Sequence, residues 1–360
     1  MKNLGFVLDG FVGGGTARVT SIIANNLVQS KGYGCFALAY TQNGKPDIYQ
    51  TDFPVEYVYE HTVSMQTAIL KHKYLGILKS FVKKNKIDIL VACGVQFYPV
   101  VTLVAKICGI KSICWEHINP TTKNDFKFQD QCRVLGAYTS DCNVVLTKSA
   151  LKIYNDRFKF KRNIQIYNPI DPTLLDKDSI YDSNSKKIVS VGRLGYQKNF
   201  ERLIEIASCI FKDNTEWSWD IYGEGPDREK IETLIKNKNL SGKVRLCGQV
   251  NNLYSLYENY AFMVMTSRYE GFPMTLLEGA AKGLPMISFD IPTGPNEIIK
   301  NGENGFLCQD NGNGDMIEKI QLLMKKEELR IKMSEKSRKT AEYFSVNKIL
   351  KSWNTLLETL

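Results

Sequence analysis

A regular alternation of short apolar runs with longer helix-forming stretches constrains the fold of this chain most. In the first half, apolar runs fall at residues 4–8, 35–39, 89–92, 112–115, 143–146 and 164–167, and helix-like stretches occupy 16–30 and 100–108. Short apolar runs that alternate with helices are typical of parallel strands covered by helices on both faces. The first half therefore predicts an α/β domain.

The same alternation begins again after a linker. Asn168-Pro169-Ile170-Asp171-Pro172 opens the linker, which stays polar as far as Ser185. Strands are predicted at 187–191, 218–222, 244–247, 262–265, 286–289 and 306–307, with helices at 200–211 and 227–236. We expect two doubly wound, Rossmann-like domains, 1–168 and 169–345, which face each other across a cleft at the carboxyl ends of their strands. The last segment, 346–360, is expected to form a helix that returns to the first domain.

The segment from Arg268 to Glu278 joins a buried strand to a helix through a turn that Gly271 and Pro273 impose. Glu270 lies on the loop, and Glu278 lies about one turn inside the helix predicted over 275–282. A helix N-terminus offers unpaired N–H groups and partial positive charge, which suit phosphates or sugar hydroxyls. Two carboxylates around such a terminus indicate a nucleotide sugar. From the spacing alone, a solvated loop acid and an ordinary helix acid explain the pattern equally well.

Composition favours a soluble protein of the cytoplasm. The chain has 360 residues, enough for two domains, of which 43% are hydrophobic and 24% charged. No signal-peptide core is visible, and no uncharged apolar run is long enough to span a membrane. The nine cysteines form no C-x-x-C pair, which predicts free thiols. Asp176-Lys177-Asp178 lies in the linker rather than at a strand end, so we expect no metal there.

The basic charge is concentrated in the first half. Residues 1–170 contain 21 Lys and Arg against 11 Asp and Glu, whereas 171–360 contain 26 against 27. Part of the excess lies in a predicted amphipathic helix at 71–86, which carries Lys71, Lys73, Lys79, Lys83, Lys84 and Lys86. Such a helix can lie on the anionic inner face of a membrane, or its apolar side can pack on the protein's own sheet. No base-reading motif accompanies the lysines, so nucleic acid is not expected as a partner.

A glycine-rich turn, Gly13-Gly14-Gly15, follows the first predicted strand and precedes the first helix. Consecutive glycines let the backbone approach a ligand closely at a helix start. The turn is neither a Walker A loop nor a G-x-G-x-x-G motif, so a tight strand-to-helix connection explains it as well.

Five motifs occur in a fixed order in the second half. They are V-G-R-L-G-Y-Q-K-N from Val191, Y-G-E-G-P from Tyr222, L-C-G from Leu246, the pair Glu270 and Glu278, and the segment from Asp290 to Leu307. Together they resemble glycosyltransferase family 4, a branch of the retaining nucleotide-sugar transferases with the GT-B fold. The resemblance covers nearly the whole second half and, more loosely, the turn at 13–15 and the segment 168–171. It implies a retaining transferase that needs no metal or other cofactor.

The resemblance also implies a role for each candidate residue. Arg193 and Lys198 would hold the donor diphosphate, where cations stabilise the charge that develops on the leaving group. Glu278 would bind the nucleotide ribose, and Glu270 the donor sugar. His117, which follows the predicted strand 112–115, resembles the family's histidine beside the donor sugar, although strand-end histidines are as often structural. The remaining implied donor contacts are Gly14, Gly15, Gly248, Gly271, Phe272, Pro273, Met274, Thr275 and Leu276.

Family members favour a front-face displacement, in which the leaving phosphate oxygen accepts the acceptor proton, over the two-carboxylate scheme of glycosidases. The bacterial members that this chain resembles build capsule, exopolysaccharide or lipopolysaccharide. This implies a UDP-linked hexose or N-acetylhexosamine as donor and a lipid-linked acceptor. A nucleotide-sugar epimerase of the same architecture and a non-catalytic nucleotide-sugar-binding protein stay open as alternatives.

Overall fold

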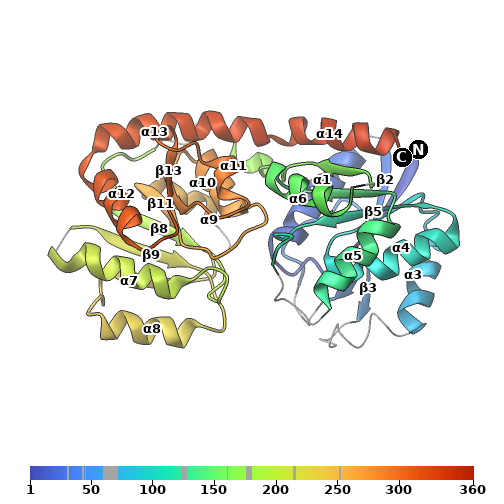
Figure 1. Ribbon diagram of the computed structural model, residues 1–360, viewed down its shortest axis with the longest axis horizontal. Helices are drawn as coiled ribbons and strands as arrows, with labels where there is room; N and C mark the ends of the chain where they lie inside the picture. The colour runs from blue at the N-terminus through green and yellow to red at the C-terminus, as the bar shows by residue number, and fades with distance from the viewer. Residues whose placement is uncertain are drawn as a thin grey trace. The chain divides into compact units, whose positions relative to one another are not determined.

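The structure is a computed structural model. It describes residues 1–30, 32–42, 44, 46–59, 72–122, 128–159, 161–175, 181–213, 216–250 and 253–360. Lys71 and the Asp176-Lys177-Asp178 segment lie outside these residues. The chain divides into two compact units, of which unit 1 comprises Met1–Pro169 with Val346–Leu360 and unit 2 comprises Ile170–Ser345. Each unit is a sheet covered by helices (Figure 1).

Unit 1 contains a seven-stranded parallel sheet in the order β3-β2-β1-β4-β5-β6-β7. Its strands are β1 (Lys2–Leu8), β2 (Tyr33–Thr41), β3 (Val55–Tyr59), β4 (Ile89–Ala92), β5 (Lys111–Glu116), β6 (Cys142–Val145) and β7 (Asn163–Gln165). Its helices are α1 (Gly15–Gln29), α3 (His72–Lys84), α4 (Tyr98–Cys108), α5 (Gln129–Thr139), α6 (Lys148–Arg157) and α14 (Val346–Glu358). The inner strands β4 and β6 are buried along their whole length, as a sheet covered on both faces requires.

The helices of unit 1 form two groups around this sheet. α3 packs on α4 and α4 on α5, whereas α1 packs on α14 (Figure 1). The last helix therefore belongs to the core of the first unit. Trp353 of α14 is 1% exposed, and its ring centroid lies 4.7 Å from that of Trp115. Lys2 Nζ donates to the Leu357 carbonyl at 2.7 Å.

Unit 2 contains a six-stranded parallel sheet in the order β10-β9-β8-β11-β12-β13. Its strands are β8 (Lys187–Val191), β9 (Ser218–Tyr222), β10 (Val244–Gly248), β11 (Phe262–Met265), β12 (Met286–Phe289) and β13 (Gly305–Cys308). Its helices are α7 (Phe200–Ile210), α8 (Arg228–Asn237), α9 (Leu253–Leu256), α10 (Met274–Ala281), α11 (Pro295–Ile298), α12 (Gly314–Lys325) and α13 (Glu327–Ala341). Buried aliphatic and aromatic side chains from strands and helices form one core.

Two doubly wound parallel α/β units confirm the predicted fold class. Five of the predicted strands, 89–92, 187–191, 218–222, 262–265 and 286–289, have the same bounds in the structure. The strand β3 is not predicted. It lies at the edge of its sheet, and all of its residues are half-buried. Its sequence therefore lacks the continuous apolar run that marks the inner strands.

Candidate active site

Two loops of unit 2 lie side by side because the strands that precede them are paired. β8 leads into residues 192–199 and β11 leads into residues 266–273, and Ile188 of β8 stands opposite Phe262 of β11. Both loops leave the carboxyl edge of the parallel sheet, where ligands bind in open α/β folds. Direct bonds join them: Arg268 N donates to Gln197 O at 2.8 Å, and Thr266 Oγ1 donates to Lys198 O at 3.0 Å.

An ion pair between Lys198 and Glu270 connects the two loops. Lys198 Nζ lies 2.6 Å from Glu270 Oε1, and the side chains are 15% and 7% exposed. Gln197 Nε2 donates to the other carboxylate oxygen at 3.3 Å and to Tyr269 O at 3.1 Å. The Lys198 side chain crosses Gly192, where an added Cβ would come within 2.9 Å of it. Because the lysine keeps some exposure, an incoming anion can reach its ammonium group.

Arg193 follows β8 by two residues and is exposed. It forms no ion pair with any residue that the structure describes. The turn after β9 approaches the β8 loop closely because it contains glycine, and it also bonds to the end of β10. A Cβ at Gly223 would lie 2.0 Å from Gly192 O, and Gly223 N donates to Gly248 O at 2.8 Å. The motif glycines thus bring three strand ends together beside Arg193.

The turn before α10 is supported by the loop that follows β12. Gly294 has φ +101°, and a Cβ there would lie 2.7 Å from Pro273 Cδ. Thr293 Oγ1 donates to the Glu270 carbonyl. Phe272, Pro273, Met274 and Leu276 are buried, whereas Gly271 and Thr275 are partly exposed. The first N–H groups of α10, which face no carbonyl of their own helix, therefore begin within a fixed turn.

Glu278 lies on α10, is 4% exposed and accepts a hydrogen bond from Tyr257 Oη at 2.7 Å. Tyr257 is fully buried in the short 3₁₀ helix η4 (Tyr257–Asn259). Lys282, the residue that follows α10, has its Nζ 3.3 Å from Glu258 Oε1. Two polar contacts therefore fix η4 to α10. Sequence analysis missed Tyr257, because it lies outside every motif and no local pattern places it opposite Glu278.

The glycine-rich turn of unit 1 leads from β1 into α1. Gly14 precedes the first helical residue, Gly15, and has φ +91°. Apart from its chain neighbours, no atom of the described residues lies within 4 Å of where its Cβ would be, so the backbone conformation rather than crowding favours glycine. Gly13 has φ +147°.

His117 follows β5 and is held by aromatic packing. Its ring centroid lies 4.3 Å from that of Trp115, and its Nε2 is buried without a hydrogen-bond partner in the described part of the chain. Burial lowers the pKa of His117 to about 3, so the imidazole is neutral at pH 7. The adjacent Glu116 accepts from Arg133 Nε at 2.7 Å and from Tyr154 Oη at 2.8 Å.

The structure thus groups the candidate residues into two sets. Lys198, Glu270 and the start of α10 form a connected set in unit 2, and Arg193, Gly248 and Glu278 lie on elements packed around it. Gly14, Gly15 and His117 lie at the carboxyl ends of β1 and β5 in unit 1. Within the described residues, no three His, Cys, Asp or Glu side chains gather as a metal site. No described helix is both long enough and apolar enough to cross a membrane.

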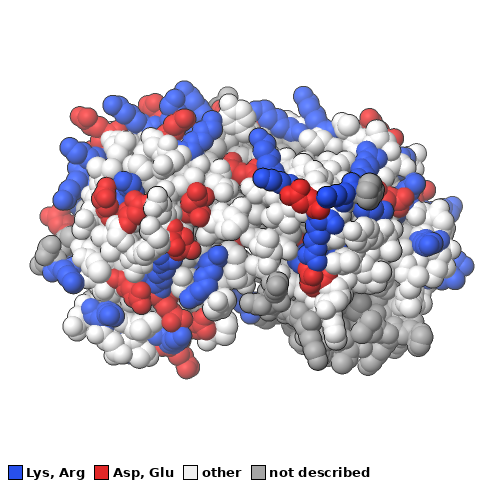
Figure 2. Space-filling view, in the orientation of Figure 1, with Lys and Arg blue, Asp and Glu red and all other residues white. Residues whose placement is uncertain are grey.

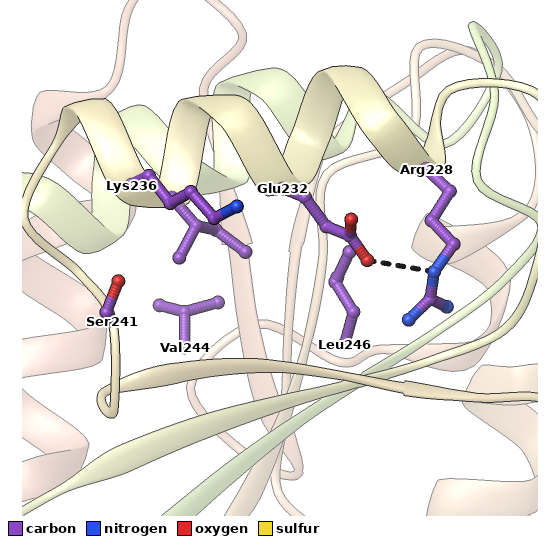
Figure 3. Close-up of a pocket in the computed structure, with 7 residues that line it drawn as sticks. Arg228, Glu232, Lys236, Ser241, Val244 and Leu246 are labelled. Carbon is purple, nitrogen blue, oxygen red and sulfur yellow. Dashed lines mark ion pairs between the residues drawn. The ribbon is translucent and has the colours of Figure 1, made fainter.

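A pocket of 210 Å³ lies apart from these residues, between α8 and β10 (Figure 3). Arg228, Glu232 and Lys236 of α8 project toward Ser241, Val244 and Leu246 on the opposite side. Arg228 pairs with both Glu224 and Glu232, so its charge is already matched. None of the candidate residues lines this pocket, and we assign it no role.

Comparison with known proteins gives consistent similarities. Residues 173–340 match the family model described as glycosyl transferases group 1. An uncharacterized glycosyltransferase of Haemophilus influenzae is 30% identical over 99% of this chain and 100% of its own. The amylovoran biosynthesis glycosyltransferase AmsD of Erwinia amylovora is 29% identical over 71% of this chain and 73% of its own. A crystal structure of S. aureus TarM with fondaparinux, alpha-GlcNAc-glycerol and UDP superimposes with a TM-score of 0.86, 17% identity and 99% coverage of both chains.

Proposed function

This chain belongs to the glycosyltransferases, and we propose that it moves a hexose or N-acetylhexosamine from a UDP-sugar to a bacterial surface glycan carried on a lipid. The ion pair between Lys198 and Glu270 carries the proposal. It places a cation and a carboxylate within 2.6 Å of each other at the carboxyl edge of a Rossmann-like sheet, beside a helix N-terminus.

In the proposed complex, Lys198 and the exposed Arg193 face the donor diphosphate. A diphosphate carries more charge than one carboxylate, so it competes with Glu270 for the ammonium group of Lys198. Glu270 then turns to the hydroxyls of the donor sugar. These cations stabilise the negative charge that grows on the leaving diphosphate as its bond to the sugar breaks. We propose that they serve this purpose without a metal ion.

The nucleotide is proposed to lie along the outer strands of the sheet. Glu278 accepts hydrogen bonds from the ribose hydroxyls, the base lies beside Gly248, and the N–H groups of Gly271, Phe272, Met274 and Thr275 meet phosphate and sugar oxygens. The UDP bound to TarM supports this choice of nucleotide. His117, Gly14 and Gly15 are proposed to contact the donor sugar from unit 1. Neutral imidazole at His117 suits a hydroxyl partner, because it adds no charge to the site.

The proposed chemistry retains the configuration of the sugar. The acceptor hydroxyl attacks the anomeric carbon on the face from which the diphosphate leaves, the C–O bond to the diphosphate breaks, and a phosphate oxygen takes the hydroxyl proton. Glu270 orients the sugar and forms no bond to it. The acceptor is proposed to be a bacterial surface glycan, which the similarity to the amylovoran biosynthesis glycosyltransferase AmsD supports. We propose that a lipid carries this acceptor. Assignment to family 4 in particular stays a prediction.

A thermal-shift and donor-hydrolysis screen against UDP-, GDP-, ADP- and dTDP-sugars tests the donor site. We expect stabilisation by a UDP-sugar that disappears in Glu278→Ala. Stabilisation by another nucleotide class would correct the base assignment. If no nucleotide sugar stabilises the protein, the donor proposal fails. Anomeric analysis of the product then tests retention, and identification of the product separates transfer to an acceptor from epimerisation of the sugar.

A further inference from the structure

Exposed large hydrophobic side chains concentrate on one face of unit 1. Among the ten such side chains in the described residues, five lie on or next to two helices. Leu103 and Ile107 of α4 are 46% and 55% exposed, and Leu135 and Tyr138 of α5 are 53% and 50% exposed. Phe128, the residue before α5, is 54% exposed. We call these five residues the α4–α5 face.

The members of the α4–α5 face are close enough to form one surface. Residues four apart on α4 and three apart on α5 lie on the same side of their helix. The two helices are in contact, since Thr139 Oγ1 donates to Thr102 Oγ1 at 2.8 Å. A pocket of 360 Å³ opens between them and is lined by residues of both, among them Lys106 and Tyr138. The surface over α4 and α5 is largely uncharged in Figure 2.

Basic side chains on α3 and α4 lie beside this apolar surface. Lys106 is exposed on α4, and Lys79 and Lys83 are exposed on α3, which packs on α4. These three lysines form no ion pair with another described residue. The acids nearby are already paired: Asp141 lies 3.0 Å from Lys111 Nζ, and Asp130 lies 2.6 Å from Arg157 Nη2. The surroundings of the α4–α5 face are therefore net positive.

The basic helix itself cannot supply the apolar contact. On α3, Tyr74, Leu78, Phe81 and Val82 are at most 4% exposed and pack in the core of unit 1. Of the two possibilities left open for residues 71–86, packing on the protein's own sheet is the one that the described part of the helix shows. The exposed lysines of α3 can attract an anionic surface, but apolar insertion must come from α4 and α5.

Charge favours a lipid surface over a second copy of the chain as the occupant. A two-fold contact through this face would bring the same lysines of both copies together, where like charges repel. Anionic headgroups complement them, and exposed apolar side chains beside lysines are the composition of a shallow interfacial contact. We propose that the α4–α5 face seats unit 1 on an anionic lipid bilayer, where the lipid-linked acceptor of the proposed function resides.

The test is co-sedimentation of the full chain with vesicles of phosphatidylcholine alone or mixed with phosphatidylglycerol. We expect the protein to bind the mixed vesicles, and Leu103→Ser/Ile107→Ser to bind them roughly tenfold less at every salt concentration, since exposed apolar area is lost. Lys79→Gln/Lys83→Gln should lose binding mainly at low salt, where charge attraction is strongest. Ile331→Ser, an equally conservative change at a 40%-exposed position on α13 of unit 2, should bind as the original does.

Three outcomes overturn the inference. In the first, the original chain fails to bind the mixed vesicles. In the second, Leu103→Ser/Ile107→Ser binds them as well as the original chain does. If light scattering shows a dimer that this variant converts to a monomer, the face is an interface between copies, which also overturns it. Because the inference rests on the proposed function, UDP affinity is measured on the same preparations. If Leu103→Ser/Ile107→Ser keeps the UDP affinity of the original chain but loses vesicle binding, the inference is supported. If the original chain does not bind UDP, the proposed donor site is contradicted, whereas the proposed lipid contact is not.

Discussion

Each unit contains a sheltered ion pair at the carboxyl edge of its sheet, and the two pairs differ in what can reach them. Arg133 and Glu116 in unit 1 are each 1% exposed, and Tyr154 also donates to the carboxylate. Lys198 and Glu270 in unit 2 are 15% and 7% exposed and lie in loops. A fully enclosed pair can only hold its surroundings in place. A partly open pair can exchange one partner for a charged ligand, which makes it suitable for a binding site.

The largest effect is expected when the enclosed pair is broken. Glu116→Ala leaves the Arg133 guanidinium buried without its carboxylate, which should lower the free energy of unfolding by about 3–5 kcal/mol. Urea unfolding followed by tryptophan fluorescence measures this. Glu116→Leu/Arg133→Met, which removes both charges, should recover much of the loss. A change below about 1 kcal/mol in Glu116→Ala would show that water reaches the pair.

Breaking the open pair should affect catalysis more than stability. Lys198→Met removes a cation from the diphosphate, and we expect kcat to fall about 10²- to 10³-fold. Initial rates at saturating donor measure it, with a thermal melt to confirm folding. Lys186→Ala is the control, because that lysine forms an exposed pair with Glu216 in the same unit. Normal turnover in Lys198→Met would place the diphosphate elsewhere.

A smaller effect is expected from acid on unit 1. The pKa of His117 is lowered by burial to about 3, whereas in the unfolded chain it is near 6.5. As pH falls below 6.5, the His117 imidazole binds a proton in the unfolded chain but stays neutral in the folded chain. The stability that is present above pH 6.5 is therefore lost. The loss should reach roughly 2 kcal/mol at pH 5.

His117→Gln removes this contribution without removing the carboxylates, which titrate in both proteins. The unfolding free energy of the original chain minus that of His117→Gln should therefore decrease steadily from pH 7 to pH 5. Parallel curves over that range would mean that the imidazole is protonated in the folded protein.

The smallest effect concerns the orientation of Glu278. Tyr257→Phe removes one hydrogen bond to its carboxylate, so UDP should bind roughly two- to tenfold more weakly. A UDP analogue without ribose hydroxyls should bind both proteins equally, because it cannot form hydrogen bonds with the Glu278 carboxylate in either of them. Tyr260→Phe is the matched control, since that buried hydroxyl donates to Asp220 at 2.8 Å instead. Equal weakening for UDP and the analogue would make Tyr257 a packing residue alone.

The same contrast explains what could be predicted from the sequence. In unit 2 the open pair is formed by motif residues. Gly192 is required by a close contact within its own motif, and Gly223 and Gly294 are required by close contacts with neighbouring motifs. Inner strands such as β8 and β11 were predicted because a strand buried on both faces must be apolar throughout.

The features that were missed depend on distant packing. Tyr257 meets Glu278 only after β11 and α10 have folded between them, and β3 is an edge strand without a continuous apolar run. Arg133 and Glu116 are seventeen positions apart on different elements. The α4–α5 face was not predicted either, because a helix pattern shows which side is apolar and not how much of that side stays uncovered.

The return of α14 to unit 1 has a consequence for synthesis on the ribosome. Unit 2 is continuous in the chain, so all of its strands are available once residue 345 has emerged. Unit 1 lacks the Trp353 ring beside Trp115, and the carbonyl of Leu357 for Lys2, until those two residues have emerged. Of the two units, the one translated first is thus completed last, and a nascent chain stalled between residues 345 and 353 would present a finished unit 2 joined to an unfinished unit 1.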